Sequence, residues 1–417
     1  MANLVKILII GNGFGGIYTL RNLHKFFHGK KMERKVELAL IGKKNYFLFT
    51  PLLHEVATGG INASNIVEPI RKVLGCCLDK FYMGQADMVN IKNKTVSVSG
   101  TSINYDYLVL ATGSETNFYN IPGAEQHSFA LKSIEDAIRI KNHCVAQMER
   151  ASRMDDREER RRVLRFVVVG GGPTGVELAA ELEELVKETF AIYYKKEIMK
   201  DVSITLIQKN KSLVPQFGEK MQKKSLEVLM RKGIEVRLGS SVLEIGHSKI
   251  VLDNNETIFT ENVFWVAGIK PVVPEFDEDV EKSSDGRLIA NNYLELENHP
   301  EIFTIGDAVL VKNPDGSPVP TLAQAAEKEA YAVAKNLHLL LNGRSPEKFS
   351  YKSAGNLLSL GQWMAAGEIL NFTFSGRFTW WIWRTVYLSK LISWRKKVRV
   401  AADWTMNIFS ARDISQL

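Results

Sequence analysis

The first forty residues carry a strong pattern of hydrophobic positions. A predominantly apolar stretch, Val5–Ile10, leads into the glycine-rich stretch Gly11–Gly16. A helical pattern follows to about Phe27, and a second predominantly apolar stretch covers Val36–Ile41. Stretches dominated by Val, Ile and Leu are typical of strands that are buried on both faces of a parallel sheet. The pattern therefore predicts a strand, a glycine loop, a helix and a second parallel strand.

The same pattern returns in the middle of the chain. The apolar run Phe166–Val169 precedes the glycine-rich stretch Gly170–Gly175, a long helix begins near Thr174, and Val202–Ile207 is rich in β-branched and aliphatic residues. Two such segments predict an α/β protein with two Rossmann-like domains, each built on a doubly wound sheet. A further helix is predicted over Thr321–Leu341.

Both glycine stretches have the spacing Gly-x-Gly-x-x-Gly. The first glycine permits a tight turn, the second lets the backbone approach a pyrophosphate, and the third allows close packing of helix and strand. The phosphates then lie at the helix N-terminus, where free N–H groups favour anions. One such motif is weak evidence, but two in the same context predict two dinucleotide sites.

The acid that usually ends each motif, where it holds the ribose hydroxyls, is missing from both. Gly42 occupies the first position and is followed by Lys43, a candidate cofactor contact. Gln208 occupies the second position. A neutral residue there removes the repulsion that rejects a 2′-phosphate, so NADPH is a candidate beside NADH.

The surplus charge is local. The formal net charge is +7, and Arg377–Arg399 contains seven cations and no acid. The tryptophans Trp380, Trp381, Trp383 and Trp394 lie within it. Tryptophan rings and long cationic side chains suit an anionic membrane surface. The alternative is a core helix with a solvated basic end, and the pattern leaves open whether the stretch is one helix or two. Nucleic acid is a disfavoured partner because no recognition motif accompanies the basic stretch.

Other classes of protein are disfavoured by what the sequence lacks. No run of 18 uncharged apolar residues predicts a transmembrane helix, and no signal peptide is expected. Three cysteines, Cys76, Cys77 and Cys144, cannot form a four-cysteine metal site, so no metal is predicted. Adjacent cysteines pair poorly, and we expect buried, inert thiols.

Two further segments resemble parts of a flavin site. Tyr107–Gly113 resembles the strand and Ala-Thr-Gly turn of two-dinucleotide-domain flavoproteins, and Ile302–Asp307 resembles their Gly-Asp motif. The resemblance implies FAD in the first domain and a nicotinamide nucleotide in the inserted one. Disulfide reductases of that superfamily need two cysteines four residues apart, which this chain does not have.

The resemblance becomes more specific in four segments: Asn45–Gly59, Gly170–Leu182, Ala323–Ala326 and Arg395–Leu417. They resemble type II NADH:quinone oxidoreductases, essentially from end to end. In that family one FAD passes two electrons from NADH to a membrane quinone without pumping protons. The resemblance implies an FAD domain in two parts (1–118 and 283–345), an NAD(P)H domain (119–282, with a charged connector 149–165) and a C-terminal membrane-associating unit (346–417).

The resemblance also assigns roles by position. Glu177, in the second glycine helix, and Gln324, on the quinone side, are the implied catalytic residues. The ordinary interpretation of Glu177 is an acid that complements the helix dipole. The implied cofactor-binding residues are Gly11, Gly13, Phe14, Gly15, Gly16, Lys43, Pro51, Leu52, Ala111, Thr112, Gly113, Gly170, Gly172, Pro173, Thr174, Gly175, Gln208, Gly268, Gly306, Asp307, Ala323 and Gln324.

Some residues depart from the family's pattern. The paired glutamines after Ala-Gln are Lys328 and Glu329 here, and a frequent lysine is replaced by Ala354. Lys352 is a candidate substitute for that lysine. Ubiquinone and menaquinone are not distinguished.

Two other readings stay open at this point. One is a soluble flavoenzyme similar to ferredoxin or rubredoxin reductases, and the other is a non-enzymatic flavoprotein similar to apoptosis-inducing factor. The favoured location is the cytoplasmic face of the inner membrane, as a peripheral protein, and a homodimer is left open.

Overall fold

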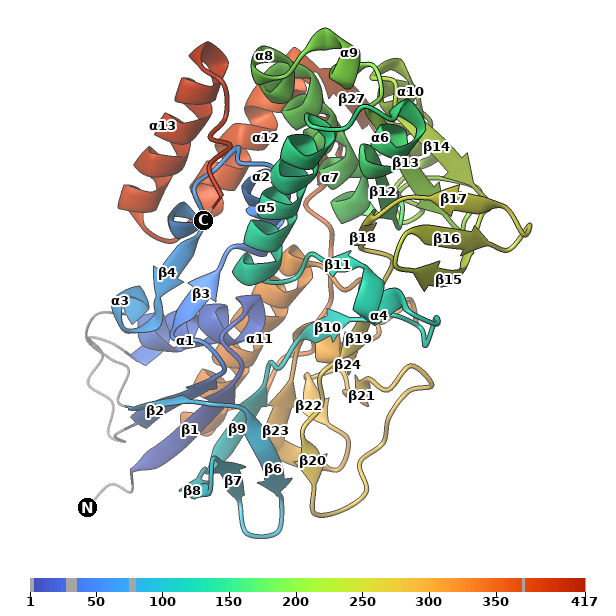
Figure 1. The fold of residues 1–417 in the computed structure, drawn as a ribbon. Helices are drawn as coiled ribbons and strands as arrows, with labels where there is room; N and C mark the ends of the chain where they lie inside the picture. The colour runs from blue at the N-terminus through green and yellow to red at the C-terminus, as the bar shows by residue number, and fades with distance from the viewer. Residues whose placement is uncertain (1–3, 28–35, 75–79, 370–371, 417) are drawn as a thin grey trace. The chain divides into compact units, whose positions relative to one another are not determined.

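The computed structural model describes residues 4–27, 36–74, 80–369 and 372–416. They form two compact units, each assembled from separate stretches of chain. The first unit contains residues up to Leu48, Val67–Glu115 and Ile269–Ser353. The second unit contains Phe49–Ile66, Thr116–Gly268 and the residues from Ala354 onward. Figure 1 shows the elements of both units, coloured along the chain.

A six-stranded sheet forms the centre of the first unit. Its order is β22 (Glu295–Leu296), β23 (His299–Thr304), β9 (Tyr107–Leu110), β1 (Val5–Ile10), β2 (Val36–Gly42) and β5 (Lys80–Met83). All neighbours are parallel except β22 and β23. Ile7 and Ile9 of β1 are fully buried, as its predominantly apolar sequence predicts. The predicted strands are confirmed, with β2 one residue longer than expected.

Two helices of the first unit pack against each other beside this sheet. They are α1 (Phe14–Phe27) and α11 (Ala323–Leu341). Ile17, Leu20 and Leu23 of α1 are fully buried at helical spacing. The remaining elements of the unit are short: β3 (Tyr46–Leu48), β4 (Val67–Pro69), α3 (Ile70–Leu74), β6 (Ala86–Asn90), β7 (Thr95–Val98), β8 (Thr101–Asn104), β10 (Ser114–Thr116, whose last residue is in the second unit), β19 (Ile269–Pro271), β20 (Glu275–Phe276), β21 (Leu288–Ile289), η4 (Gly306–Ala308) and β24 (Val309–Leu310).

The second unit repeats the parallel arrangement. Its five-stranded sheet has the order β11 (Phe129–Ala130), β18 (Asn262–Trp265), β12 (Arg165–Val169), β13 (Ser203–Gln208) and β14 (Glu235–Leu238). The sequence β18–β12–β13–β14 corresponds to β9–β1–β2–β5 of the first unit, so both glycine motifs follow the central strand of the same topology. The helices of this part are α4 (Ala124–His127), α5 (Ile134–Ala151), α6 (Arg157–Val163), α7 (Pro173–Glu184), η3 (Leu185–Phe190), α8 (Ala191–Tyr193), α9 (Lys196–Met199) and α10 (Glu219–Arg231).

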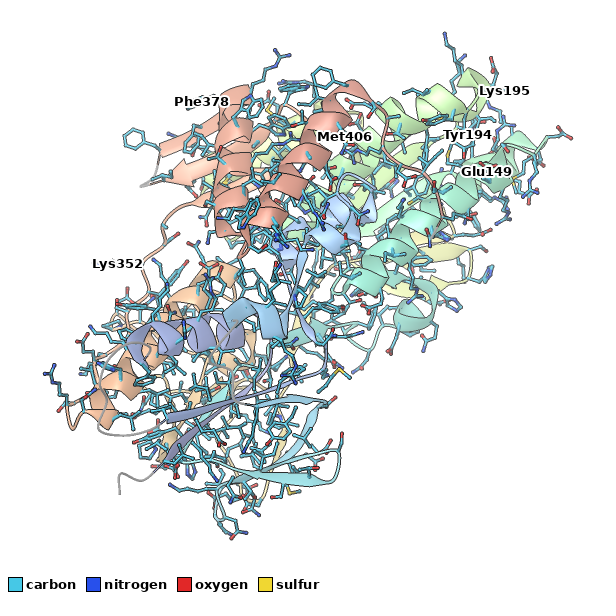
Figure 2. All side chains as sticks on the ribbon, turned by 90° about the vertical axis from the view of Figure 1, so that its left-hand side faces the viewer. Glu149, Tyr194, Lys195, Lys352, Phe378 and Met406 are labelled. Carbon is cyan, nitrogen blue, oxygen red and sulfur yellow. The ribbon has the colours of Figure 1, made fainter. Side chains whose placement is uncertain are left out.

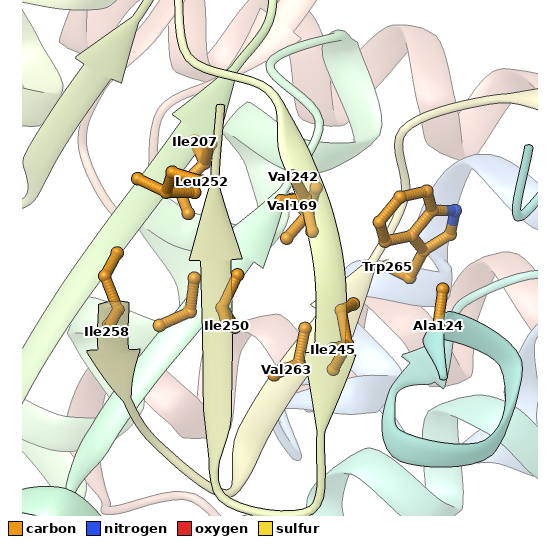
Figure 3. Close-up of a cluster of buried hydrophobic side chains, with 11 residues drawn as sticks. Ala124, Val169, Ile207, Val242, Ile245, Ile250, Leu252, Ile258, Val263 and Trp265 are labelled. Atoms are coloured by element: carbon orange, nitrogen blue, oxygen red, sulfur yellow. The ribbon is translucent and has the colours of Figure 1, made fainter. Parts of the chain in front are cut away.

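A three-stranded meander covers part of this sheet. Its strands are β15 (Val242–Gly246), β16 (Lys249–Leu252) and β17 (Thr257–Phe259). Figure 3 shows their inward side chains packed against those of the sheet, with Trp265 at one end. Ile250 of β16 is fully buried there. The cluster therefore fixes the meander to the nucleotide-binding sheet.

The charged connector is fixed to its surroundings by ion pairs. Asp201 has a fully buried side chain and accepts charge-assisted hydrogen bonds from Arg157 and Arg160 of α6, at 3.0 and 2.8 Å. Tyr194 donates a 2.8 Å hydrogen bond to Glu149 at the start of the connector, and Figure 2 shows the two residues side by side. The connector is therefore mainly a short helix that is anchored at both ends.

The C-terminal part belongs to the second unit. It contains a small antiparallel sheet, β25 (Asn356–Ser359), β26 (Ala365–Ile369) and β27 (Phe372–Gly376), and two helices, α12 (Arg377–Lys390) and α13 (Trp394–Phe409). The basic stretch is thus two helices, because the chain is extended at Leu391 and Ser393 caps the second helix at Lys396 N–H. The segment 49–66, with η1 (Thr50–Leu52), α2 (Leu53–Ala57) and η2 (Ala63–Asn65), contacts α13: Asn65 donates a 2.7 Å hydrogen bond to Asp403.

The expectation that four tryptophans face a membrane is wrong for two of them. Trp380 and Trp383 are 2% and 1% exposed, whereas Trp381 and Trp394 are 51% and 69% exposed. The Trp383 ring lies 5.8 Å from that of Trp404. An indole that packs among other rings gains more from burial in the protein than at a surface.

One of the seven cations is also interior. The Arg384 guanidinium lies 3.6 Å from the ring centre of Trp380 and 4.7 Å from that of Trp404. Burial lowers its pKa to about 10. Among the described helices, none combines the length and the apolar character that a bilayer span requires.

Candidate functional site

The first glycine loop has the stereochemistry that its spacing predicts. Gly11 has φ +110°, and a Cβ there would lie 2.0 Å from the carbonyl oxygen of Ala111. A Cβ on Gly16 would lie 1.8 Å from the Gly11 carbonyl oxygen. Gly13, between them, has nothing within 4 Å of its Cβ position. Gly11 thus forms the tight turn, Gly13 leaves an open approach for a phosphate group, and Gly16 allows the close packing, as the motif predicts.

Asn12 explains why a glycine, and not an acid, occupies position 42 at the end of β2. Its amide donates hydrogen bonds to the carbonyl oxygens of Lys44 and Tyr46, at 2.8 and 2.7 Å. A Cβ on Gly42 would lie 2.8 Å from the Asn12 side chain. The glycine at 42 therefore makes room for Asn12, and Lys43 beside it is exposed.

The Ala111–Gly113 turn and the Gly306–Asp307 turn meet through side chains of the first unit. Ser114 donates a 2.6 Å hydrogen bond to Asp307, and Ile305 N–H donates to Leu110 O at 2.9 Å. Gly15 packs against Ile305 and Ala111. Phe14, on the first turn of α1, lies edge-on to Phe47 at 5.1 Å. The predicted flavin segments Gly11–Gly16, Ala111–Gly113 and Gly306–Asp307 are thus brought together at the carboxyl ends of β1, β9 and β23.

Glu329 is a buried acid that the sequence analysis noted only as a departure. Its carboxylate accepts a 2.6 Å hydrogen bond from Gly306 N–H and so fixes the turn that carries Asp307. Burial, and then the nearby charge of Asp307, raise the pKa of Glu329 to about 7. A glutamine could not be protonated in this way, so the departure adds a titratable group beside the turn.

Ala323 and Gln324 are the first two residues of α11, and Gln324 is half-buried. Lys328, one turn further on, donates a hydrogen bond to the carbonyl oxygen of Lys352 and lies over the ring of Tyr351 at 5.3 Å. Lys352 itself is exposed, and Figure 2 shows it at the surface. The side chain of Lys328 is therefore linked to the backbone of Lys352.

The second glycine loop repeats the geometry of the first. Gly170 has φ +115°, a Cβ on Gly175 would lie 1.8 Å from the Gly170 carbonyl oxygen, and Gly172 is open within 4 Å. Gly172 is the N-cap of α7, with Pro173 at the first helical position and Thr174 exposed after it. Proline is well suited to a position whose N–H has no partner in the helix. The helix N-terminus is therefore available to an anion.

Gln208 supports that loop directly. Its side-chain oxygen accepts a 3.1 Å hydrogen bond from Gly171 N–H, and its amide donates to Ser212 O at 3.3 Å. Gly268 follows the neighbouring strand β18, and a Cβ on Gly268 would lie 2.0 Å from the Tyr119 hydroxyl. The neutral side-chain amide of Gln208 thus positions the glycine loop without placing a charge next to it.

Pro51 and Leu52 form the short helix η1 of the second unit. Leu52 is fully buried and Pro51 is partly exposed. Burial in the core alone explains why position 52 is a leucine. Cys144 is a buried free thiol, as expected, whereas Cys76 and Cys77 lie outside the described residues.

Glu177 lies on the first turns of α7 and is 7% exposed. One carboxylate oxygen accepts a 3.1 Å hydrogen bond from Ser359 N–H, and the other lies 3.5 Å from Nδ1 of His54. Burial raises the pKa of Glu177 well above its ordinary value, although the Ser359 hydrogen bond opposes this shift. Burial also lowers the pKa of His54 to about 4. A neutral histidine therefore faces a carboxyl group that tends to keep its proton.

Sequence reasoning missed the group of acids behind Glu177. Glu177, Glu181 and Glu184 follow one face of α7 at helical spacing, and all three are buried. Arg412, from the C-terminal tail, makes ion pairs with Glu181 and Glu184 at 2.8 and 2.9 Å. Three acids on one face of a predicted buried helix were the signal that could have identified the group.

Two more acids complete this group, which we call the carboxylate cluster: Glu55, Glu177, Glu181, Glu183 and Glu184. Burial and the charge of Glu181 raise the pKa of Glu55 to about 8. Burial and the charge of Glu181 raise that of Glu184 to about 7. Burial would raise the pKa of Glu181 too, but the charge of Arg412 holds it below its ordinary value. The cluster thus contains both ionised and protonated carboxyl groups near neutral pH.

Comparisons with known proteins agree with this geometry. The pyridine nucleotide-disulphide oxidoreductase family matches residues 5–330, and the NDH2 C-terminal domain matches residues 354–413. A probable NADH dehydrogenase of Dictyostelium discoideum is 33% identical, over 98% of this chain and 91% of its own length. The chain belongs to the type II NADH:quinone oxidoreductases.

Members from distant organisms align over nearly the whole chain. The type II NADH:quinone oxidoreductase Ndh of Mycobacterium tuberculosis is 28% identical, over 98% of this chain and 89% of its own length. The structure of NDH2 from Plasmodium falciparum in complex with NADH has a TM-score of 0.90 at 22% identity, with 99% of each chain covered. The resemblance inferred from the sequence and the α/β fold class are thus confirmed.

Proposed function

We propose that this type II oxidoreductase holds FAD on the Gly11–Gly16 loop and NADH on the Gly170–Gly175 loop. The observation that carries the assignment is that both loops have the same turn, open approach and close packing. Two dinucleotides therefore fit one chain, as its reaction requires. The chain is an FAD-dependent enzyme that oxidises NADH and reduces a membrane quinone.

The protein residues position the reactants and handle protons. When bound, FAD would supply the two-electron chemistry that connects NADH to a quinone. The N-terminus of α7 binds the NADH pyrophosphate, and Gln208 maintains the loop shape through Gly171. We assign Glu177 to holding a proton near the nicotinamide, since its burial favours the protonated form. Gln324, at the start of α11, is assigned to the quinone side.

The fit of FAD to the first unit rests on a hydrogen-bonded set. Asp307, fixed by Ser114, is placed to bind the ribityl chain, and Gly13 leaves room for the pyrophosphate. The Glu329 hydrogen bond to Gly306 N–H holds this turn in place.

We further propose that an anionic lipid surface is a partner of α12 and α13. Phe378, Trp381, Trp394, Val398, Met406 and Phe409 are exposed large apolar side chains on these helices. Figure 2 labels Phe378 and Met406 on the two adjacent helices. Arg395, Lys397 and Arg399 lie among them, so apolar insertion and charge attraction would act together. The cytoplasmic face of the inner membrane is the proposed location.

An anaerobic stopped-flow experiment tests the assignment. The purified holoprotein is mixed with NADH, and the flavin absorption band is followed. Rapid, near-complete bleaching is expected, followed by return of the band when a quinone is added. A flavin band that NADH leaves unchanged would reject the function. Parallel steady-state assays with NADH and NADPH, each against ubiquinone and menaquinone analogues, then determine the substrates.

A further inference from the structure

The proposed reaction consumes one proton from solution. NADH gives two electrons and one proton as hydride, becoming NAD⁺, while a quinone gains two electrons and two protons to become a quinol. The second proton must come from water. If the proposed function holds, this proton needs a route to the buried Glu177.

His54 is placed to exchange protons with Glu177. Its Nδ1 lies 3.5 Å from Glu177, and both side chains are less than one-tenth exposed. The other ring nitrogen, Nε2, is buried and makes no hydrogen bond within the described residues. A neutral imidazole can accept a proton at one nitrogen while it releases one from the other.

Other members of the carboxylate cluster act electrostatically on His54 and Glu177. Glu181, one turn after Glu177 on α7, is the group whose negative charge acts most strongly on His54. Glu55 is the next residue along α2 and accepts a 2.6 Å hydrogen bond from the Trp404 indole. Arg384 from α12 and Arg412 from the tail also act on Glu55. On α12, Tyr387 is influenced by the charge of Glu177.

The cluster holds more acid than base. Its five carboxyl groups interact with four cations among the described residues, Arg384, Arg412, Lys187 and Lys232. Buried groups tend toward neutrality because an uncompensated charge is costly away from water. Protons therefore remain on part of the cluster, as the raised pKa values of Glu55 and Glu184 indicate.

A route to water exists at the other end of the cluster. Lys232 binds Glu183 and Glu184 at 2.8 and 3.1 Å, and its side chain is 20% exposed. Glu183 also pairs with Lys187 at 2.9 Å, and that side chain is 58% exposed. Protons lost from the cluster can be replaced there.

We propose that His54 carries protons between Glu177 and the other members of the carboxylate cluster, so that the proton consumed by quinone reduction arrives through the interior of the second unit. His54 does not touch a substrate in this scheme and acts through Glu177. Oxidation of NADH by the flavin takes no proton from water, whereas formation of quinol does. The two half-reactions therefore separate the proton route from the overall function.

The test compares His54→Gln with the matched control His143→Gln in FAD-loaded protein. His143 is a largely buried histidine whose Nε2 lies 2.8 Å from Asn262 Oδ1. Bleaching by NADH is expected to stay within about twofold of wild type in both variants. Return of the band with a soluble quinone is expected to slow at least about tenfold in His54→Gln alone, with a larger solvent deuterium isotope effect between pH 5 and 8.

Each outcome decides one question. A His54→Gln variant that restores the band at the wild-type rate throughout this pH range overturns the proton route, whereas a wild type that NADH fails to bleach overturns the function itself. A His54→Ala variant that imidazole in solution accelerates supports proton transfer, because a purely structural histidine would not be rescued. If neither variant folds, Glu183→Gln at the solvent end should slow the same step, and an unchanged rate there rejects the route.

Discussion

The indole N–H of Trp404 donates a 2.6 Å hydrogen bond to a carboxylate oxygen of Glu55, which lies 349 positions earlier in the chain. Both side chains are buried. The inner face of α13 is thus part of the interior of the second unit, while the outer face carries the exposed apolar residues. The C-terminal helices cannot be an independent anchor that is appended to a finished enzyme.

The substitution Trp404→Phe should lower the free energy of unfolding by about 1–3 kcal/mol, because it leaves a buried carboxyl group without its donor. Urea unfolding followed by circular dichroism measures this change. The matched control is Trp394→Phe, on the exposed side of the same helix, which should change stability by less than about 0.5 kcal/mol. Equal effects of both substitutions would contradict the proposed importance of the Glu55 hydrogen bond.

The stability of the protein should fall as the pH rises from about 6.5 to about 8. Burial raises the folded-state pKa of Glu55 to about 8. The contribution of Glu55 to the free energy of unfolding is therefore fully present below its unfolded-state pKa, and it is lost as the pH rises through the folded-state pKa. Glu184, with a pKa of about 7, acts in the same direction. His54 has a lowered pKa and acts in the opposite direction, but only below about pH 6.5.

Thermal unfolding at closely spaced pH values checks this dependence. Glu55→Gln, which cannot lose a proton, should flatten the slope between pH 6.5 and 8. Glu219→Gln is a suitable control because Glu219 is on the exposed end of α10 and no cluster residue contacts it through an ion pair. A wild-type melting temperature that rises across this window would contradict the assignment.

The parts of the fold that local spacing determines could be predicted from the sequence. Gly11, Gly16, Gly170 and Gly175 each satisfy a steric requirement within one loop, so the motif carries its own geometry. The flanking strands followed from stretches that are dominated by Val, Ile and Leu. The missing acid at Gly42 was visible too, but its cause was not, because only the structure shows Asn12 in that space.

The carboxylate cluster could be predicted only in part, because four of its acids share α7 whereas Glu55 and the partner Arg412 are far away in the chain. Arg412 meets Glu184 across 228 positions, and each residue alone is typical of a solvated surface. The prediction that all side chains of the basic stretch face a membrane was wrong for a related reason. Composition showed tryptophan and cations together, but only the packing shows that Trp380, Trp383 and Arg384 face inward.

The preference between nucleotides should change in Gln208→Glu. A glutamate can still accept the Gly171 N–H hydrogen bond, but its charge would repel a 2′-phosphate. The ratio of kcat/KM for NADPH to that for NADH should fall about tenfold or more, which corresponds to about 1.4 kcal/mol. Steady-state kinetics with one quinone measure the ratio. Gln222→Glu, on α10, is the control, and a ratio unchanged in both variants would show that residue 208 does not determine the preference.

Membrane attachment should depend on the outward residues of α12 and α13 alone. The double substitution of Phe378→Ser and Trp394→Ser removes side chains that are 78% and 69% exposed, so folding should be little affected. Flotation with vesicles that contain anionic lipid should then recover much less protein than for wild type. Higher salt should weaken the wild-type attachment, since each cation near such a surface contributes about 1 kcal/mol.

The control for attachment is Met230→Ser, which removes an exposed apolar side chain from α10. It should float with the vesicles as wild type does. A double variant that still floats would contradict the lipid assignment. If instead the wild type forms dimers without lipid and the double variant does not, these outward faces bind a second copy of the chain, and the apolar side chains serve assembly in place of membrane contact.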